Sequence, residues 1–518
     1  MWAVFLFPEI SKLPPVQPHT YPTAFYVVKN TNCQYIYRMK NELLKLAYSP
    51  EDFRKRGHLL IDGLAAHLED KINEKSDRAI HWNAPEVELA FWRNFLENGE
   101  EAALFTEITK RTTHVHHPKY IGHQVSPTAP ITALSGTISA LLNNGMAVYE
   151  MGMAPSAIER VVTDILCQKM GYGQNSGGFL TSGGTLANLT ALLAARKANL
   201  DHDVWNKGHS DQLGIMVSEE AHYCIDRAAK IMGLGEKGIV KIPATEDYQM
   251  NTQLLEERYH YALKKGIKVF AIIGSAPSTA TGVYDDLNAL GKFAAKHGLW
   301  FHVDGAHGGA AIFSGKHRPL LDGIEQADSV VIDGHKMMMM PTITTALLFK
   351  NGKNASATFS QKADYLLTQS DHEDWYNSGK RTFECTKSMM SIHWFTLIKT
   401  YGLGIFDEYV TQLYDLGREF GRMVEDEPHF ELAVRPLCNI VCFRYVADTM
   451  DTFALNNLNA EIRRRLLEDG EFYIVQTILK GKQYLRITVM NPFTTADHLQ
   501  QLLAKVKMVL EGINLSPC

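Results

Sequence analysis

The stretch Ser329-Val330-Val331-Ile332-Asp333-Gly334-His335-Lys336 decides the fold class of this chain, together with Leu299-Trp300-Phe301-His302-Val303-Asp304 upstream of it. Each stretch starts as a short apolar run and ends in charged side chains. Short runs rich in β-branched and aromatic residues predict buried strands. The two stretches therefore predict two strands, with Asp304 at the end of one and Lys336 just after the other.

The same sequence pattern extends from Phe179 to Phe349, where short apolar runs alternate with helical stretches. This alternation predicts an α/β fold with a mostly parallel sheet and helices on both faces. Ligands of such sheets bind at the carboxyl ends of the strands, where Asp304 and Lys336 lie. Other predicted strands are Ile215–Val217, Val269–Ile273 and Ala346–Phe349, and predicted helices are Leu186–Ala198, Ala221–Met232 and Leu254–Lys265.

The pattern of apolar residues is different in the N-terminal and C-terminal parts of the chain. Residues 1–110 predict a mostly helical segment, and residues 401–518 predict a small α+β domain with strands at Asn439–Tyr445 and Tyr484–Val489. In that domain, one apolar helix stripe is formed by Leu499, Leu502, Leu503, Val506, Val509 and Leu510. Residues 111–400 then form the large domain that contains Asp304 and Lys336.

The composition of the 518-residue chain is that of an ordinary globular protein, with a net charge of −5 and seven scattered cysteines. The charge argues against a nucleic-acid surface. No C-x-x-C pair or Cys/His metal spacing is present, and the cysteine usage favours a reducing, cytoplasmic setting. The apolar N-terminal run Trp2–Phe7 is a poor signal peptide, and no run approaches the ~20 apolar residues of a membrane span. We therefore expect no metal, no nucleic acid and no membrane.

An aspartate and a lysine at neighbouring strand ends are what a pyridoxal phosphate (PLP) enzyme requires. The lysine holds the cofactor as a Schiff base, and the carboxylate keeps the ring nitrogen protonated. A single lysine after a strand is more often a solvated loop residue, so the remaining segments decide between the two interpretations.

Three further segments suit such a cofactor, although each has a simpler interpretation. Thr181-Ser182-Gly183-Gly184-Thr185 precedes a helix and could bind a phosphate, or could be a capped turn. His222 at a strand end could stack on an aromatic cofactor, or be a polar loop residue. The segment Gly274–Gly282, which includes Thr279, could bind a small ligand or form a tight turn.

The order of these segments resembles the group II PLP-dependent amino-acid decarboxylases, the family of glutamate, aromatic-amino-acid and 2,4-diaminobutyrate decarboxylases. The resemblance runs from about His117 to Leu510 and includes His117-Pro118-Lys119-Tyr120, Thr181–Leu189, Ala221-His222, His302–Gly309, Asp333–Met340 and Tyr484-Leu485-Arg486-Ile487. It implies a fold type I PLP-dependent transferase, as in aspartate aminotransferase, with a seven-stranded type of sheet. It also implies a homodimer with the active site at the subunit interface.

The resemblance implies a role for each matching residue. Lys336 becomes the Schiff-base lysine, Asp304 the partner of the ring nitrogen and His222 the stacking ring. Thr279 and Ala306 would support the cofactor. Phosphate contacts would come from Gly183, Gly184, Thr185 and His335, with help from Asp333. His123, Ser126 and Arg486 match substrate-pocket positions, and Arg486 could instead form a structural salt bridge.

The implied reaction is α-decarboxylation of an L-amino acid to an amine and CO2. The tyrosine that often donates the proton in this family is absent, and His372 lies near its position. Loss of that tyrosine can favour oxidative deamination to an aldehyde, so both outcomes stay open. Another fold type I lyase or an aminotransferase is a further alternative, and a non-catalytic relative is disfavoured by the intact Lys336, Asp304 and His222. Gly305, His307 and Gly334 depart from the family pattern and predict a wider space beside the cofactor.

Overall fold

The computed structural model describes residues 42–359 and 375–513 of the chain. Two compact units are distinguished, Met1–Ala65 and Ala66–Cys518. In the first unit, the described residues are almost entirely helical: residues 42–47 form one helix and α2 (Pro50–Ile72) begins shortly after it. The second unit continues with α3 (Pro85–Asn98) and α4 (Leu104–Arg111), in agreement with the predicted helical N-terminal segment.

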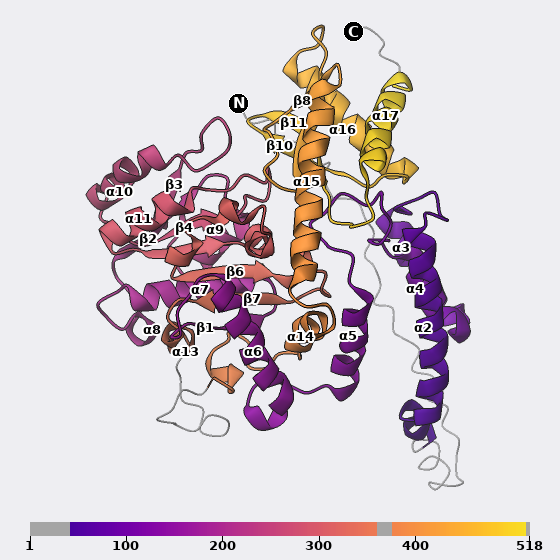
Figure 1. The fold of residues 1–518 in the computed structure, drawn as a ribbon, viewed down its shortest axis with the longest axis horizontal. Coiled ribbons are helices and arrows are strands. Elements are labelled where there is room, and N and C mark those ends of the chain that lie inside the picture. Colours follow the sequence, from indigo (N-terminus) through magenta and orange to yellow (C-terminus); the bar gives the residue numbers. More distant parts are fainter. Residues whose placement is uncertain (1–41, 360–374, 514–518) are drawn as a thin grey trace, which may run out of the picture. The chain divides into compact units, whose positions relative to one another are not determined.

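The second unit is built around a seven-stranded sheet with the order β1-β7-β6-β5-β4-β2-β3 (Figure 1). Strands β2 to β6 pair in parallel, whereas β7 is antiparallel to both of its neighbours, so the predicted mostly parallel sheet is confirmed. The strands are β1 (Gly177–Thr181), β2 (Gln212–Ser218), β3 (Ile239–Ile242), β4 (Ile267–Ser275), β5 (Trp300–Asp304), β6 (Ser329–Asp333) and β7 (Thr345–Phe349).

Helices cover both faces of this sheet, which explains why its strands are apolar on both sides. On β2, Ile215 and Val217 pack into one core and Met216 into the other. The first core contains α7 (Gly184–Ala198) and α9 (Tyr223–Ile231). The second contains residues of α6 (Met153–Lys169), α10 (Leu255–Lys264), α11 (Leu287–His297) and α14 (Ser391–Tyr401).

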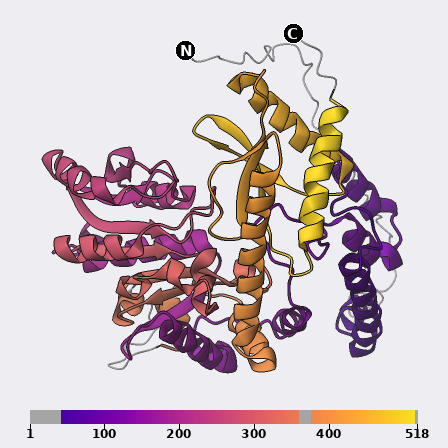
Figure 2. The same cartoon turned by 45° about the horizontal axis from the view of Figure 1, so that its top comes forward.

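The C-terminal part contains a second, antiparallel sheet with the order β10-β11-β9-β8. Its strands are β8 (Phe430–Leu432), β9 (Ile440–Tyr445), β10 (Val475–Leu479) and β11 (Lys482–Thr488), and its helices include α16 (Thr452–Asp469) and α17 (Ala496–Glu511). The long helix α15 (Gly404–Asp426, orange) contacts both this sheet and the short helical segment after β5 (Figure 2). The C-terminal part therefore has the α+β character that the sequence predicted.

Four observed strands, β1, β3, β8 and β10, were not predicted. In the large sheet, β1 begins with two glycines and β3 has only four residues, so neither has a strong strand pattern. The strands predicted around Asp304 and Lys336 agree with β5 and β6 to within one residue.

Within the described residues, no helix combines the length and apolar character needed to cross a bilayer.

Candidate active site

Lys336 lies in the single helical turn α12 (Gly334–Met337), directly after β6. Its Nζ is 3.0 Å from Oδ2 of Asp333, a carboxylate that is only 2% exposed, whereas the lysine side chain is 22% exposed. The other oxygen of Asp333 accepts a 2.5 Å hydrogen bond from Thr345 Oγ1. Burial by itself lowers the pKa of Lys336, but the carboxylates of Asp333 and Asp304 outweigh it and the pKa lies above its usual value. Lys336 is therefore a cation anchored at the carboxyl end of β6.

Asp304 is the last residue of β5, the parallel neighbour of β6, so Asp304 and Lys336 both lie at the carboxyl ends of adjacent strands, the position that the sequence predicted for them. Its Oδ2 accepts a 3.1 Å hydrogen bond from Asn188 Nδ2, and its Oδ1 accepts one of 3.2 Å from the Ala306 amide. Burial raises the pKa of Asp304, and the positive charge of Lys336 and the His222 ring act in the opposite direction. This carboxylate is suited to pair with a buried cation.

His222 precedes α9 and caps it, because its Nδ1 accepts a 3.4 Å hydrogen bond from the Cys224 amide. Burial lowers the pKa of His222, while Asp304 opposes that shift. The ring is therefore neutral near pH 7, with its proton on Nε2. His222 lies four residues after the end of β2, which runs parallel to β4, so it follows the carboxyl end of a strand in the same sheet as Asp304.

The predicted phosphate loop connects the end of β1 to the start of α7. Gly183 has φ +98°, a backbone conformation that residues with a side chain rarely adopt. A Cβ added to Gly184 would lie 3.1 Å from Asp333 Oδ2 and 3.4 Å from Ala306 Cβ. The start of α7, where helix N–H groups lack intrahelical partners, therefore lies beside Asp333 and Ala306. Thr185 is exposed in the first turn of this helix.

These groups together fit a pyridoxal phosphate. A lysine can bond its aldehyde, a carboxylate can pair with its ring nitrogen, and a helix N-terminus can bind its phosphate. His335 and Thr279 complete the predicted set. The His335 ring lies 3.1 Å from the Thr344 carbonyl and 3.7 Å from Asp333 Oδ2. Thr279 follows β4 and is half-buried.

Two of the predicted substrate residues are tied to backbone groups. Ser126 is buried and donates a 3.2 Å hydrogen bond to the carbonyl of His335, the residue before Lys336. Arg486 on β11 donates to the carbonyls of Ala280 (3.1 Å) and Thr279 (2.7 Å). Neither bond is a salt bridge, the alternative that the sequence left open for Arg486, and no carboxylate among the described residues is paired with this arginine. Arg486 thus holds the Thr279 segment from the C-terminal sheet.

The other two predicted residues have fewer described contacts. His123 is exposed, with its ring 5.7 Å from that of Tyr473. Burial and the charges of Arg486 and Arg463 lower the pKa of His123. His372, the predicted proton donor, lies outside the described residues.

Two of the departures from the family pattern, Gly305 and Gly334, leave no empty space where a Cβ would stand, so the expected widening is not seen at these two positions. A Cβ on Gly305 would lie 2.9 Å from the Val331 carbonyl, and one on Gly334 would lie 2.7 Å from Trp394. Both glycines therefore permit close packing of neighbouring groups. The His307 side chain is buried, with Nε2 2.9 Å from Asn439 Oδ1.

Two residues at this site were missed by the sequence analysis. Asn188 lies four residues after Gly184, and this helical spacing, which puts it on the same face as the loop, was the available signal. Glu384 accepts hydrogen bonds from Thr181 Oγ1 (2.8 Å) and the Ser182 amide (3.0 Å) at the start of the loop. No local pattern could have revealed Glu384, because about two hundred residues of chain separate it from the loop.

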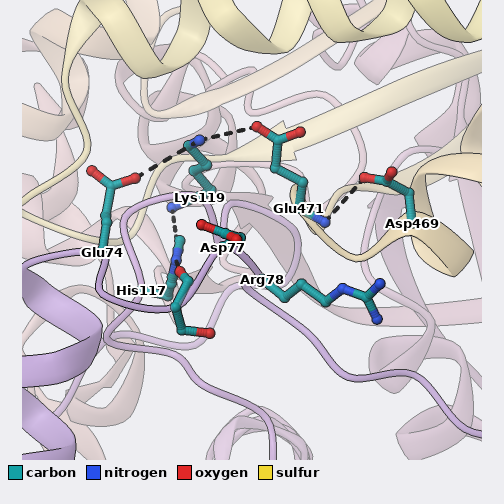
Figure 3. Close-up of a pocket in the computed structure, with 8 residues that line it drawn as sticks. Glu74, Asp77, Arg78, His117, Lys119, Asp469 and Glu471 are labelled. Carbon is teal, nitrogen blue, oxygen red and sulfur yellow. Dashed lines mark hydrogen bonds and ion pairs between the residues drawn. The ribbon is translucent and has the colours of Figure 1, made fainter.

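A separate cavity of about 570 Å³ is strongly polar (Figure 3). Lys119 Nζ lies 3.0 Å from Glu471 and 3.8 Å from Glu74, and His117 binds the Ser76 carbonyl at 2.9 Å. Ion pairs of Lys119 therefore join the segment after α2 to the loop between α16 and β10. Among the described residues, no group of three or more His, Cys, Asp or Glu side chains is arranged to hold a metal. The lining residues are Glu74, Ser76, Asp77, Arg78, His117, Lys119, Asp469 and Glu471.

Comparison with known proteins agrees with this geometry. Residues 97–446 match the family model described as the pyridoxal-dependent decarboxylase conserved domain. The chain is 26% identical to an aromatic-L-amino-acid decarboxylase of Bacillus atrophaeus over 91% of this chain and 98% of that protein. It is 24% identical to a phenylacetaldehyde synthase of Arabidopsis thaliana over 87% and 94% of the two chains.

A solved structure is similar over most of both chains. It is the glutamate decarboxylase domain of a diaminobutyrate-pyruvate transaminase and L-2,4-diaminobutyrate decarboxylase from Vibrio parahaemolyticus. It superposes with a TM-score of 0.76 at 26% identity, over 88% of this chain and 96% of that chain.

Proposed function

The chain belongs to the pyridoxal-dependent decarboxylase family, and on that premise we propose that Lys336, Asp304 and His222 form its active site. The reaction is the α-decarboxylation of an L-amino acid to the corresponding amine and CO2, which makes the protein a carboxy-lyase with pyridoxal phosphate as its cofactor. The observation that carries the site assignment is the placement of Asp304 and Lys336 at the carboxyl ends of the adjacent parallel strands β5 and β6.

Each residue has a distinct task. When bound, pyridoxal phosphate supplies a ring that takes up the electron pair left by the departing carboxylate. Lys336 Nζ would hold the cofactor by its aldehyde until the substrate amine takes that position. Asp304 keeps the ring nitrogen protonated, because a carboxylate stabilises a neighbouring cation. His222 packs on the ring and fixes its plane.

The remaining groups orient the reactants. The start of α7, with Gly183, Gly184 and Thr185, would bind the phosphate together with His335, and Ala306, which lies beside Gly184, would support the cofactor. Asp333, at 3.0 Å from Lys336, serves the lysine more directly than the phosphate, because two anions repel each other. We propose His123, Ser126 and Thr279 as pocket residues, and Arg486 as the residue that positions the Thr279 segment.

His372 is proposed as the group that delivers a proton to Cα after CO2 has left, because an imidazole exchanges protons near neutral pH. The similarity to an aldehyde-forming synthase makes the outcome at this step worth measuring. The protein is incubated with a panel of acidic, diamino, aliphatic and aromatic L-amino acids, which identifies the substrate class. The amounts of amine and of aldehyde plus peroxide are then measured, which identifies the product. Predominant aldehyde in the wild-type chain would overturn the assignment as a simple decarboxylase.

The first test of the site is Lys336→Ala. We expect loss of the visible absorbance of the lysine-bound cofactor, and loss of 14CO2 release from carboxyl-labelled substrate. Lys350→Ala, which removes a lysine at the end of the neighbouring strand β7, is the matched control and should retain both signals. Full turnover in Lys336→Ala would refute the assignment.

We also propose a cytoplasmic homodimer, with residues 1–110, 111–400 and 401–518 as the helical segment, cofactor domain and small domain. Support for the dimer comes from α5 (Pro130–Leu142), where the exposed fractions of Leu134, Ile138 and Leu141 are 48%, 54% and 62%. Exposed apolar patches of this kind mark interaction surfaces.

A further inference from the structure

A row of polar side chains lies behind Asp304 in the core between β5 and α7. Trp300, His302 and Asp304 alternate along β5 and therefore share one face of the sheet. Ser329 on β6 is paired in register with His302. Asn188 reaches this row from α7. Exposed fractions of these five residues are between 0% and 9%, so the row is closed to solvent.

Four hydrogen bonds connect the row. Trp300 Nε1 lies 2.9 Å from Ser329 Oγ, and Ser329 Oγ lies 2.8 Å from His302 Nδ1. His302 Nε2 lies 2.7 Å from Asn188 Oδ1, and Asn188 Nδ2 lies 3.1 Å from Asp304 Oδ2. The second hydrogen of the Asn188 amide is directed to Cys224 Sγ at 3.5 Å.

The two ends of this chain of bonds determine its direction. The indole N–H of Trp300 can only donate, and an ionised Asp304 can only accept. Burial lowers the pKa of His302 to about 3, so its ring is neutral and carries one proton. The proton must lie on Nε2, because Asn188 offers its carbonyl oxygen to His302 and its amide to Asp304. One N–H or O–H group of each residue, from Trp300 through Ser329 and His302 to Asn188, therefore donates in the direction of the Asp304 carboxylate.

Aligned donors of this kind strengthen one another in a medium of low dielectric. They favour the ionised carboxylate and so act against the burial that raises the pKa of Asp304. They also hold the carboxylate in one orientation, since Asn188 binds Oδ2 while the Ala306 amide binds Oδ1.

We propose that Asn188, His302, Ser329 and Trp300 are positioning residues that keep Asp304 ionised and directed at the ring nitrogen of the cofactor. This inference rests on the proposed function, which places Asp304 beside that nitrogen. None of the four residues needs to touch the substrate or the reacting atoms.

The test compares the dissociation constants of pyridoxal phosphate and of its carbocyclic analogue, in which carbon replaces the ring nitrogen. Binding to the cofactor-free protein is followed by quenching of intrinsic fluorescence. Asn188→Leu should weaken binding of pyridoxal phosphate about tenfold, the loss expected for one hydrogen bond to a charged group. Ser329→Ala and Trp300→Phe, which remove more distant donors with little change of shape, should weaken it about threefold. Binding of the analogue should stay within twofold of wild type in all three variants.

Ser135→Ala is the matched control, because Ser135 Oγ forms a buried 2.8 Å hydrogen bond with His393 Nδ1 away from this row. It should change neither dissociation constant. If the Ser329 and Trp300 variants lose affinity equally for both ligands, the row has a merely structural role. If they lose affinity for neither ligand, the row does not act on Asp304. Either result would overturn the inference. Failure of the wild-type protein to prefer pyridoxal phosphate over the analogue would instead overturn the position of Asp304 in the proposed function.

Discussion

At the residue scale, Asp304 carries a charge that its buried position disfavours. The proposed role requires that charge, because a neutral amide cannot keep the ring nitrogen of the cofactor protonated. Asp304→Asn should therefore retain bound cofactor and lose about 100-fold or more in turnover, the usual magnitude for one preorganised electrostatic group. The measurement is initial-rate kinetics at matched cofactor occupancy.

Asp328→Asn is the control for this change, because Asp328 binds the Phe301 amide (2.8 Å) at the opposite end of the same two strands. It should retain turnover. Undiminished turnover in Asp304→Asn would refute the electrostatic role.

His307 makes a residue-scale prediction about pH. Burial lowers its pKa to about 3 in the folded protein, against about 6.5 in the unfolded chain. Between those values the unfolded state binds more protons, so the folded state loses stability as the pH falls from 6.5 towards 3. His307→Gln removes this contribution. As the pH falls below 6.5, the unfolding free energy of the wild type should therefore decrease relative to that of the variant. The expected decrease is up to about 1.4 kcal/mol per pH unit.

Urea unfolding of the cofactor-free proteins at pH 7, 6 and 5 measures this shift. Asp285, whose pKa burial raises to about 6, and Asp304 act in the opposite sense, but both are present in the two proteins and cancel in the difference. Parallel pH curves for wild type and variant would contradict the prediction.

At the scale of elements, a buried ion pair supports the strand that leads into the phosphate loop. Lys387 Nζ lies 2.7 Å from Glu159 Oε1 on α6 and 2.6 Å from the Leu180 carbonyl on β1. Burial lowers the pKa of Lys387, and the Glu159 carboxylate opposes that shift. The pair therefore joins α6 to β1 just before Thr181 and Ser182.

Glu159→Leu should destabilise the fold by about 3 kcal/mol, because it leaves a buried ammonium group without its counter-charge. The double variant Glu159→Leu, Lys387→Met should recover most of that loss, since apolar side chains of similar volume can replace a buried pair. Chemical denaturation of the single and double variants gives the coupling free energy. Additive losses would show that the two side chains do not act as a pair.

At the scale of the whole molecule, the proposed dimer assigns a function to the apolar face of α5. Ile138→Asp places a charge in the middle of that face and should convert the dimer to a monomer in analytical ultracentrifugation. If the active site lies at the subunit interface, turnover should fall when the dimer is lost. Leu263→Asp on α10, where the leucine is 45% exposed, is the control and should leave the assembly unchanged. A dimer that survives Ile138→Asp would exclude α5 as its interface.

Much of the architecture could be predicted because it depends on local pattern. The runs before Asp304 and Lys336 have apolar residues on both faces. A strand with this pattern must be covered on both faces, as the helices of an α/β fold cover it. Glycines before a helix predicted the loop at Gly183, whose φ of +98° suits glycine. Strand β1 escaped prediction because its pairing with β7, rather than its own propensity, makes it a strand.

The fold class and the order of the residues proposed to hold the cofactor could be predicted from local pattern, since the strand period and the sites after strand ends are local properties. The surroundings of these residues depend on tertiary packing. It brought Glu384 to the phosphate loop and Arg486 to the Thr279 carbonyl, and it packed Gly305 against the Val331 carbonyl where the sequence suggested open space. It also aligned Trp300, Ser329, His302 and Asn188 behind Asp304. These contacts join segments far apart in the chain, and their geometry depends on how β5, β6 and α7 pack, which no local pattern encodes.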